Sequence, residues 1–287
     1  MNQARILGVI GYPIGHSLSP LLHEIFGKHT GEKIYYAPYP VKENLALAIQ
    51  GAWHLGFCGL NVTIPYKTQV IPELAEVDET AGSIGAVNTL VRSEGGFTGY
   101  NTDIYGIGAL VKSQGIEIKN RPVCILGAGG AAKSVVHMCG QEGAFSLCIV
   151  NRDADRARAL QRESKRFFSM PIDVCSLEEV RRDVSRLPEG LVVFQTTSVG
   201  MYPHREDCII SDPAFFEKMA AGVDLVYTPL ETAFLRRCRA AGKPGISGLG
   251  MLIYQGARAF SLWTGKEIPP QGLEEARVRL EEALRNS

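Results

Sequence analysis

A glycine-rich segment in the middle of the chain constrains its fold more than any other feature. The residues Gly127-Ala128-Gly129-Gly130-Ala131-Ala132 directly follow the apolar run Val123–Leu126 and open a stretch with helical character. In a strand–turn–helix unit, such glycines allow a tight turn and a close approach of the backbone to a pyrophosphate at the helix N-terminus. We therefore predict a dinucleotide site at this turn. The alternative is a plain strand-to-helix connection.

Strands and helices are predicted to alternate on both sides of this segment. Apolar runs separated by amphipathic stretches are typical of a mainly parallel sheet covered by helices. The alternation forms two separate blocks, and 287 residues are long for a single core, so we predict two α/β domains. The predicted strands cover residues 5–10, 34–39, 57–62, 82–91, 123–126, 147–150, 191–196 and 223–226.

Local signals mark where several helices begin. Ser19-Pro20 places a hydroxyl at an N-cap position and a proline at the first helical position. Pro65 is predicted to begin another helix of the first block. The two C-terminal helices could pack on either block. The other predicted helices cover about 43–55, 101–114, 130–142, 154–168, 251–263 and 271–286.

The charge balance argues against several classes of partner. Thirty basic residues balance thirty acidic ones, so no global field attracts nucleic acid or an anionic membrane. No segment approaches the roughly 18 consecutive apolar residues of a membrane helix, and the N-terminal residues 1–5 lack the apolar stretch of a signal peptide. We therefore expect a cytoplasmic protein with a small-molecule substrate and no nucleic-acid or membrane partner.

The cysteines and histidines argue against a metal centre. The seven cysteines are scattered with no Cys-x-x-Cys pair, which is typical of reduced thiols rather than of a disulfide frame or a zinc site. The six histidines are dispersed, and we expect no bound metal. A serine hydrolase is also disfavoured, because the sequence has no Gly-x-Ser-x-Gly elbow.

The segment after the second strand of the second block bears on the choice of cofactor. In a dinucleotide fold, the tip Asn151-Arg152-Asp153-Ala154-Asp155-Arg156 would meet the adenosine ribose. Arg152 and Arg156 favour the 2′-phosphate of NADP, because a guanidinium fork matches phosphate oxygens. Asp153 could instead bind the free 2′-hydroxyl of NAD, or could only cap the helix that begins at Ala154. We predict NADP, and NAD stays open.

Polar side chains in the first block lie at or just past the ends of predicted strands. Because ligands in open α/β sheets bind outside the carboxyl ends of the strands, these groups could share one crevice and bind a polyol. Ser17 and Ser19 could also receive a carboxylate. As alternatives, Ser19 and Asn101 could only cap helices and Asn88 could only end a strand. The set comprises Ser17, Ser19, Asn61, Thr63, Lys67, Asn88, Asn101 and Asp103.

Lys67 is the strongest candidate for a catalytic group. Oxidation of a secondary alcohol sends a hydride to the nicotinamide and a proton to a protein group, and a lysine beside an aspartate can exchange that proton. Asp103 could orient Lys67 and bind the same hydroxyl. The alternative is an ordinary surface ion pair, worth at most about 1 kcal/mol.

Taken together, these motifs resemble the shikimate dehydrogenase family. The matching segments span nearly the whole chain and occur in the order typical of the family. They are Gly15–Pro20, Asn61–Lys67, Ala86–Thr89, Gly99–Asp103, Gly127–Ala132, Asn151-Arg152, Thr197–Met201, Asp224–Thr232 and Gly248–Phe260.

The resemblance implies an architecture and a reaction. It places a substrate-binding α/β domain at residues 1–104, a Rossmann-type NADP domain at 105–247, and helices at 248–287 that return to the substrate domain. The family reaction is the reversible NADPH-dependent reduction of 3-dehydroshikimate to shikimate, a step toward chorismate and the aromatic amino acids. The Lys67–Asp103 pair would lie at the chemistry, and we expect a monomer or homodimer.

The resemblance also assigns roles to individual residues. The substrate would contact Ser17, Ser19, Asn61, Thr63, Lys67, Asn88, Asp103, Tyr227 and Gln255. The cofactor would contact Gly127, Ala128, Gly129, Gly130, Ala131, Asn151, Arg152, Asp153, Arg156, Thr196, Thr197, Ser198, Val199, Val226, Gly248 and Met251. As a bare sequence, Met251 fits a core position equally well.

Two positions leave alternatives within this family. Relatives often have threonine where this chain has Asp153, which leaves the cofactor preference open. Ser19 favours shikimate, since relatives that prefer quinate often have threonine there. The nearest alternative is an NAD-preferring quinate/shikimate dehydrogenase. A nucleotide-binding sensor without catalysis is a further alternative, and the presence of both Lys67 and Asp103 argues against it.

Overall fold

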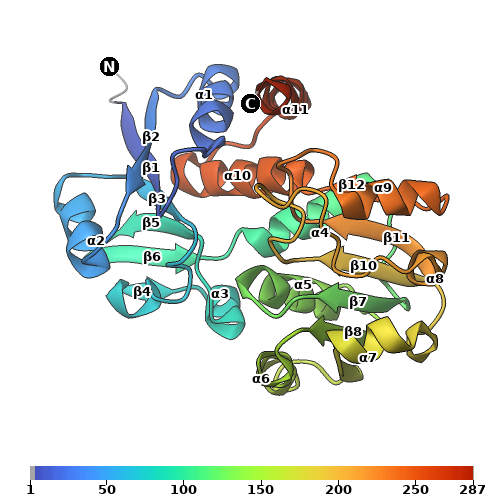
Figure 1. Cartoon of the computed structure of the whole chain (residues 1–287). Coiled ribbons are helices and arrows are strands. Elements are labelled where there is room, and N and C mark those ends of the chain that lie inside the picture. Colours follow the sequence, from blue (N-terminus) through green and yellow to red (C-terminus); the bar gives the residue numbers. More distant parts are fainter. Residues whose placement is uncertain (1–3, 287) are drawn as a thin grey trace. The chain divides into compact units, whose positions relative to one another are not determined.

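The computed structural model describes residues 4–286, and the chain divides into two compact units. Unit 1 comprises Met1–Gly106 and Leu252–Ser287, and unit 2 comprises Ile107–Met251. Each unit is built on one six-stranded sheet (Figure 1). The chain passes from one unit to the other within two helices, α4 (Asp103–Ser113) and α10 (Leu249–Thr264). The predicted mixed α/β fold class is confirmed.

The sheet of unit 1 is parallel except for one strand. Its strands lie in the order β2-β1-β3-β5-β6-β4. β5 runs antiparallel to both of its neighbours, whereas β1 pairs in parallel with β2 and β3, and β4 pairs in parallel with β6. The strands are β1 (Arg5–Gly11), β2 (Ile34–Pro40), β3 (Gly59–Val62), β4 (Glu76–Val77), β5 (Thr89–Ser93) and β6 (Gly96–Tyr100).

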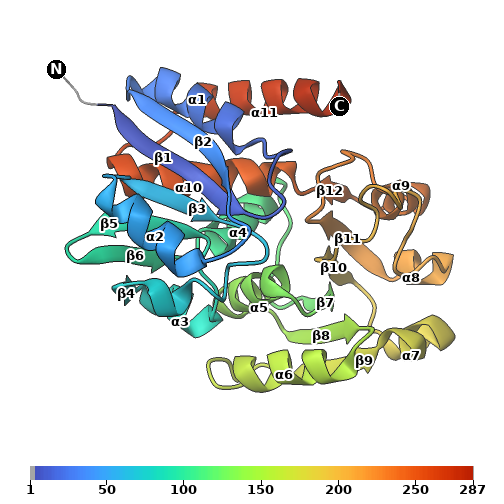
Figure 2. The same cartoon turned by 60° about the vertical axis from the view of Figure 1, so that its left-hand side comes forward.

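The C-terminal helices of the chain pack on unit 1. Helix α11 (Pro270–Arg285) lies beside α1 (Ser19–Thr30) (Figure 2). From α10, Trp263 packs against Leu7 of the sheet, and its indole N–H donates to the carbonyl oxygen of Leu90 at 2.8 Å. This face of the sheet is thus closed by residues far apart in the sequence.

The opposite face of the unit 1 sheet forms a separate core. Alternate strand residues such as Leu60, Val62 and Leu90 face it, because successive side chains of a strand point to opposite sides. Ile49 of α2 (Leu45–His54) packs into the same core. The remaining elements of this part of the chain are α3 (Glu79–Ile84) and the 3-10 helix η1 (Ile71–Glu73).

Gly59 lets α10 approach the sheet. A Cβ atom at this position would lie 2.0 Å from Nε1 of Trp263 and 2.6 Å from the carbonyl oxygen of Leu90. Those two atoms form the hydrogen bond that anchors Trp263. Only glycine therefore leaves room for this contact.

The helix predicted after Ser19-Pro20 exists, but its predicted cap is wrong, and so is the helix predicted at Pro65. Ser19 is the first residue of α1 rather than its N-cap; Leu18 occupies the cap position, with no side-chain cap bond. Pro65 lies in a series of turns that leads into η1, and it does not begin an α-helix. The carbonyl oxygen of Lys67 accepts from the Val87 N–H at 2.7 Å, so it serves a distant partner instead of a helical ladder.

The predicted strand at 82–91 is also wrong for most of its length. Oδ1 of Asp78 accepts from the Thr80 N–H at 2.9 Å and so caps the start of α3. The C-cap of this helix is Gly85, with a φ of 66°. The strand begins only at Thr89 and continues into a hairpin with β6. β6 is absent from the predicted strands, and its two glycines weaken its strand pattern.

The sheet of unit 2 is entirely parallel and has the doubly wound Rossmann order. Its strands lie in the order β12-β11-β10-β7-β8-β9. The direction of winding reverses between β7 and β10, where folds of this kind bind their ligands. The strands are β7 (Pro122–Leu126), β8 (Ser146–Asn151), β9 (Ile172–Ser176), β10 (Leu191–Gln195), β11 (Met219–Asp224) and β12 (Gly245–Ser247).

Helices cover the sheet of unit 2. On one face, alternate residues of β7, β8 and β10 form a core with Phe215, Phe216 and Phe234. The seven cysteines are free. Among residues 4–286, no helix combines the length and the apolar character needed to cross a membrane. The helices are α5 (Gly130–Gln141), α6 (Ala154–Ser164), α7 (Leu177–Arg182), η2 (Val184–Arg186), α8 (Pro213–Glu217) and α9 (Ala233–Ala240).

We expect Gly59→Ala to lower the free energy of unfolding by about 1–3 kcal/mol, because the added methyl group would push Trp263 off the sheet. Urea denaturation of purified protein measures this change. Gly51→Ala is the matched control, since a Cβ atom at this position of α2 meets no atom within 4 Å. The control should match wild type or gain about 0.5–1 kcal/mol. Equal unfolding midpoints for Gly59→Ala and wild type would contradict the packing argument.

Candidate functional site

Three predicted catalytic and substrate residues meet at one edge of the unit 1 sheet. Lys67 follows β3, and Asp103 follows β6 at the start of α4. Asn88 directly precedes β5 rather than ending a strand. Because β5 runs against its neighbours, its beginning lies at the same edge as the ends of β3 and β6. Asn88 therefore reaches the predicted edge, although the strand assignment behind that prediction is wrong.

The Asp103 carboxylate is held through both of its oxygens. Oδ2 lies 2.6 Å from Nζ of Lys67, and Oδ1 accepts from Nδ2 of Asn88 at 2.8 Å. The Asp103 side chain is 5% exposed and that of Lys67 is 23% exposed. The pair is thus too enclosed to be the ordinary surface ion pair of the alternative interpretation. It leaves one amine partly open beside a fixed carboxylate.

Asn88 is fixed in turn by a network of threonines and Gln255. Its Oδ1 accepts from the Thr102 N–H at 2.7 Å and from the Thr89 hydroxyl at 3.1 Å. Gln255 of α10 places Oε1 3.4 Å from Nδ2 of Asn88 and 3.3 Å from the Thr102 hydroxyl. Thr89 and Thr102 are fully buried, and we did not predict them as site residues. Their positions next to Asn88 and Asp103 in the sequence could have indicated that they belong to the site.

Asn101 has a structural role beside this network. Its Oδ1 accepts from the Ile104 N–H at 3.3 Å, and its Nδ2 donates to the carbonyl oxygen of Ala86 at 2.9 Å. The first bond caps α4 and the second ties the loop before β5 to the end of β6. Asn101 therefore caps α4, the role that the alternative interpretation gave it.

The other predicted substrate residues of unit 1 lie in β3, at the start of α1, and in the segments after β1 and β3. Asn61 lies within β3, where its Oδ1 accepts from the Tyr36 hydroxyl at 2.7 Å. Ser17 accepts from the Ser19 N–H at 3.3 Å. Thr63 follows β3, and its N–H donates to the carbonyl oxygen of Ile10 at 2.9 Å. Asn61 and Ser19 are 7% and 9% exposed, so little of either side chain is open to solvent.

In unit 2, the glycine-rich turn lies between β7 and α5. Gly127 has a φ of 118°, and a Cβ atom there would lie 2.5 Å from Oγ1 of Thr196. The N-cap of α5 is Gly129, which provides no side-chain cap. A Cβ atom at Gly129 or Gly130 would meet no atom within 4 Å. The first amides of α5, including that of Ala131, are thus uncapped and approachable, as a pyrophosphate site requires.

The tip after β8 shows what Asp153 does. Its Oδ1 accepts from the backbone N–H groups of Asp155 and Arg156 at 3.0 and 3.1 Å. Its Oδ2 lies 3.4 Å from Nε of Arg156. Asp153 is therefore the N-cap of α6, as the structural alternative held. Arg152 is exposed and forms no ion pair within residues 4–286, so its guanidinium is open to an anion. Asn151 donates to the Asp153 carbonyl oxygen at 2.8 Å.

One network holds the loops after β10 and β11. Gln195 accepts from the Thr197 N–H at 2.6 Å and donates to the carbonyl oxygen of Val199 at 3.0 Å. It also donates to the Asp224 carboxylate at 3.2 Å. Asp224 accepts further bonds from the Val226 N–H at 3.0 Å and the Thr232 hydroxyl at 2.6 Å. Burial raises the pKa of Asp224 from 3.8 to about 6.

This network positions loops that the family pattern assigns to the cofactor. Thr196, Thr197, Ser198 and Val199 lie in the loop after β10, and Val226 lies in the loop after β11. Gln195 and Asp224 were not among the predicted site residues. Both are polar residues at the ends of apolar strands, which could have indicated buried groups that need hydrogen-bond partners.

The remaining predicted residues of unit 2 follow β11 and β12. Tyr227 comes directly after Val226, and burial raises the pKa of its hydroxyl. A Cβ atom at Gly248 would lie 2.3 Å from the carbonyl oxygen of Leu225, so glycine permits this close approach. Met251 is half-buried in α10. Tyr227 belongs to unit 2, whereas the other predicted substrate residues belong to unit 1.

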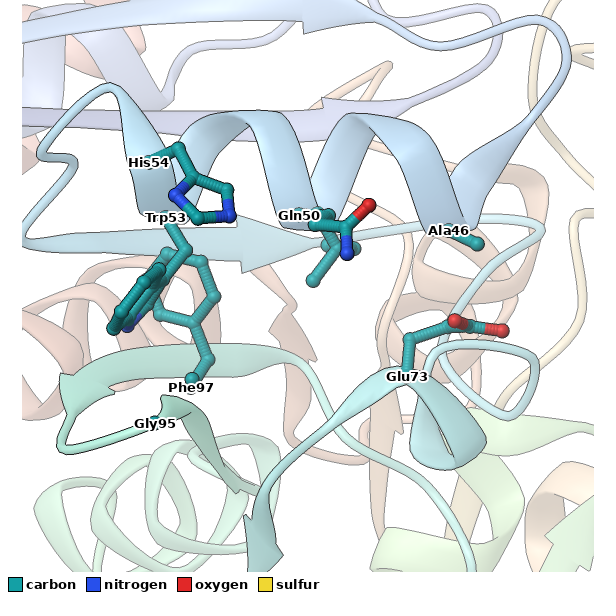
Figure 3. Close-up of a pocket in the computed structure, with 9 residues that line it drawn as sticks. Ala46, Gln50, Trp53, His54, Glu73, Gly95 and Phe97 are labelled. Carbon is teal, nitrogen blue, oxygen red and sulfur yellow. The ribbon is translucent and has the colours of Figure 1, made fainter.

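Unit 1 also contains a hollow of about 290 Å³ away from these residues. Trp53, His54 and Gln50 of α2 reach into it from one side, and Phe97 and Glu73 lie opposite (Figure 3). Its lining includes no predicted site residue. Across residues 4–286, no three or more His, Cys, Asp and Glu side chains are grouped so that they could hold a metal ion.

Comparison with known proteins supports one family across the whole chain. Residues 9–90 match the shikimate dehydrogenase substrate binding domain, and 109–204 match shikimate / quinate 5-dehydrogenase. Residues 248–276 match the shikimate 5′-dehydrogenase C-terminal domain. The shikimate dehydrogenase (NADP(+)) of Methanothermobacter thermautotrophicus is 36% identical over 97% of this chain and 98% of that protein. The chain belongs to the shikimate dehydrogenase family.

Solved structures show the same similarity. Shikimate 5-dehydrogenase from Thermus thermophilus, in complex with NADP(H) and shikimate, has a TM-score of 0.82 and 35% identity, with 96% of this chain and 99% of that chain covered. Quinate dehydrogenase from Corynebacterium glutamicum, in complex with NAD, has a TM-score of 0.86 and 30% identity, with 96% and 100% covered. The family identified from the sequence motifs is confirmed.

The raised pKa of Asp224 predicts a pH dependence of stability. An aspartate in the unfolded chain has a pKa of about 3.9. Between about pH 4 and 6 the folded protein therefore holds a proton at Asp224 that the unfolded chain has lost. The stabilising contribution of Asp224 therefore falls as the pH rises through this window and is constant above it. Asp224→Asn should remove this part of the slope.

Denaturant unfolding of wild type and Asp224→Asn at pH 4, 5, 6 and 7 measures the effect. Asp173→Asn, an exposed position on β9, serves as the control and should keep the wild-type slope. The assignment is wrong if the free energy of unfolding of Asp224→Asn varies with pH as that of wild type does.

Proposed function

We propose that this chain catalyses the reversible NADPH-dependent reduction of 3-dehydroshikimate to shikimate. The observation that carries the proposal is the enclosed Lys67–Asp103 pair, held by Asn88 at the edge of the unit 1 sheet. Relatives that align over more than nine-tenths of the chain are named shikimate dehydrogenase (NADP(+)). We assign substrate binding to unit 1 and cofactor binding to unit 2.

Lys67 is assigned as the group that moves the proton. Reduction of a ketone adds a hydride to the carbonyl carbon and a proton to the carbonyl oxygen, and bound NADPH supplies the hydride. The Lys67 ammonium gives the proton during reduction, and the neutral amine takes it from the hydroxyl during oxidation. Asp103 receives a hydrogen bond from Nζ at 2.6 Å and so aims the amine. Asn88 holds the second carboxylate oxygen and keeps Asp103 from turning away.

Hydroxyl and amide groups of unit 1 are assigned to the rest of the substrate. Shikimate carries a carboxylate and several hydroxyls, and the Ser17 and Ser19 hydroxyls suit the carboxylate. The Thr63 hydroxyl and the Gln255 amide suit the ring hydroxyls beside Lys67. We retain Asn61 and Tyr227 as predicted substrate residues on the strength of the family pattern.

The glycine-rich turn and Arg152 are assigned to the cofactor. The uncapped start of α5 and the open space at Gly129 and Gly130 suit a pyrophosphate. Arg152, with no competing ion pair in residues 4–286, suits a 2′-phosphate. Asp153 is engaged as a helix cap, which reduces its value as a ribose ligand. These observations favour NADP over NAD.

A second candidate function is an NAD-linked quinate dehydrogenase. The similarity to the Corynebacterium glutamicum quinate dehydrogenase supports it. Steady-state kinetics with shikimate or quinate, each with NADP or NAD, separates the two activities. We expect the highest kcat/KM with shikimate and NADP. Cofactor binding without turnover of either substrate would support the non-catalytic sensor instead. Cytoplasmic location and a monomeric or homodimeric state stay predictions from sequence.

We expect Lys67→Ala to lower kcat by about a hundredfold or more and to change KM for shikimate much less, because the amine acts mainly in proton transfer. Lys33→Ala is the matched control, since Lys33 is an exposed lysine of the same unit. Steady-state assays of both variants, with circular dichroism to confirm folding, measure the effect. A kcat of Lys67→Ala close to that of wild type would refute the assigned role.

Arg152→Ala should raise KM for NADP about tenfold or more and leave KM for NAD within about twofold, because the guanidinium binds only the 2′-phosphate. Arg158→Ala provides a control on α6, where Arg158 pairs with Asp155 at 3.0 Å. Initial rates at varied concentrations of each cofactor give these constants. Equal losses with NADP and NAD would show that Arg152 does not bind the 2′-phosphate.

A further inference from the structure

A group of partly and fully buried aromatic side chains lies behind the predicted substrate residue Asn61. Tyr36 of β2 donates its hydroxyl hydrogen to Oδ1 of Asn61 at 2.7 Å. This bond ties β2 to β3. Tyr36 itself was not predicted as a site residue.

The bond from Tyr36 fixes the orientation of the Asn61 amide. Nδ2 of Asn61 donates to the carbonyl oxygen of Asn88 and to the Thr89 hydroxyl, both at 3.2 Å. With Oδ1 accepting from Tyr36, each end of the amide has a defined partner. The Thr89 hydroxyl in turn donates to Asn88 Oδ1 at 3.1 Å. A chain of hydrogen bonds therefore connects Tyr36 to Asn88, the residue that holds Asp103.

His23 packs against Tyr36 from α1. The two rings stack with centroids 4.3 Å apart and planes 20° apart. Ser19 and His23 are four residues apart on one helix, so they face the same way. Phe260 and Trp263 of α10 lie on other sides of the imidazole, with centroids 6.1 and 5.2 Å away. Tyr36 is thus held by a fully buried ring.

A histidine is a costly residue at this position. Neither ring nitrogen of His23 has a hydrogen-bond partner within residues 4–286. Leaving a buried polar group unpaired costs about 1–3 kcal/mol, which an apolar side chain would avoid. Burial lowers the pKa of His23 to about 3, so the ring stays uncharged beside Tyr36. A buried polar side chain that lowers the stability of the fold beside a predicted site indicates a role in that site.

We propose that Tyr36 is a positioning residue for substrate recognition, acting through Asn61. This inference rests on the proposed function, because it assigns Asn61 to the substrate. Tyr36 keeps the Asn61 amide in one orientation through the bond between β2 and β3. His23 holds the Tyr36 ring in place. Loss of the Tyr36 hydroxyl should therefore weaken substrate recognition more than chemistry.

The test is Tyr36→Phe, which removes one oxygen atom and keeps the ring. We expect KM for shikimate to rise about tenfold, with kcat within about threefold and KM for NADP unchanged. Tyr35→Phe is the matched control on the same strand, because Tyr35 is 71% exposed. It should match wild type in all three constants.

A double-mutant cycle separates positioning from general stability. If Tyr36 acts through Asn61, Tyr36→Phe should add little to the KM of Asn61→Ala, whereas independent effects would multiply. An unchanged KM in Tyr36→Phe, or a multiplied effect in the double variant, would overturn this inference while wild type remains active on shikimate. If wild type does not turn over shikimate at all, the proposed function fails first and this inference fails with it.

Discussion

The hydrogen-bonded Asp103 carboxylate is the interaction on which the unit 1 site depends. Lys67 and Asn88 each hold one oxygen, at 2.6 and 2.8 Å, so the carboxylate has no freedom to rotate. Lys67 follows β3 and Asn88 precedes β5, and the two meet because β5 runs against its neighbours. A simple all-parallel sheet would carry the start of β5 to the opposite edge. The reversed direction of β5 therefore determines both the topology of the sheet and the place of Asn88 in the site.

The sequence allowed the fold class and most of the site to be predicted, because both leave local patterns. Alternating apolar runs identified the two sheets, and the glycine-rich turn identified the start of α5. The errors occurred where distant partners decide the structure. Residues 79–84 form α3 instead of the predicted strand, because the Asp78 side chain caps the first amides of this helix. The segment after Pro65 is not helical because the Lys67 carbonyl oxygen bonds Val87 instead.

The roles of other residues could not be identified from the sequence, because the same side chain can serve several different roles. Asp153 could have bound a ribose or capped a helix, and in the structure it caps α6. Gln195 and Asp224 looked like ordinary strand ends, yet together they hold two loops of unit 2. Tyr36 fits the aromatic content expected of any strand. In each case the deciding information is which neighbour the folded chain supplies.

The contact between Gly59 and Trp263 also has a consequence for biosynthesis. Trp263 closes a face of a sheet whose strands all lie within the first hundred residues. A ribosome makes the chain from its N-terminus, so every residue of unit 2 is synthesised before Trp263 becomes available. While unit 2 is translated, Leu7 and its neighbours in the nascent unit 1 sheet are therefore not yet covered by Trp263. Exposed apolar surface of this kind is what chaperones bind during translation.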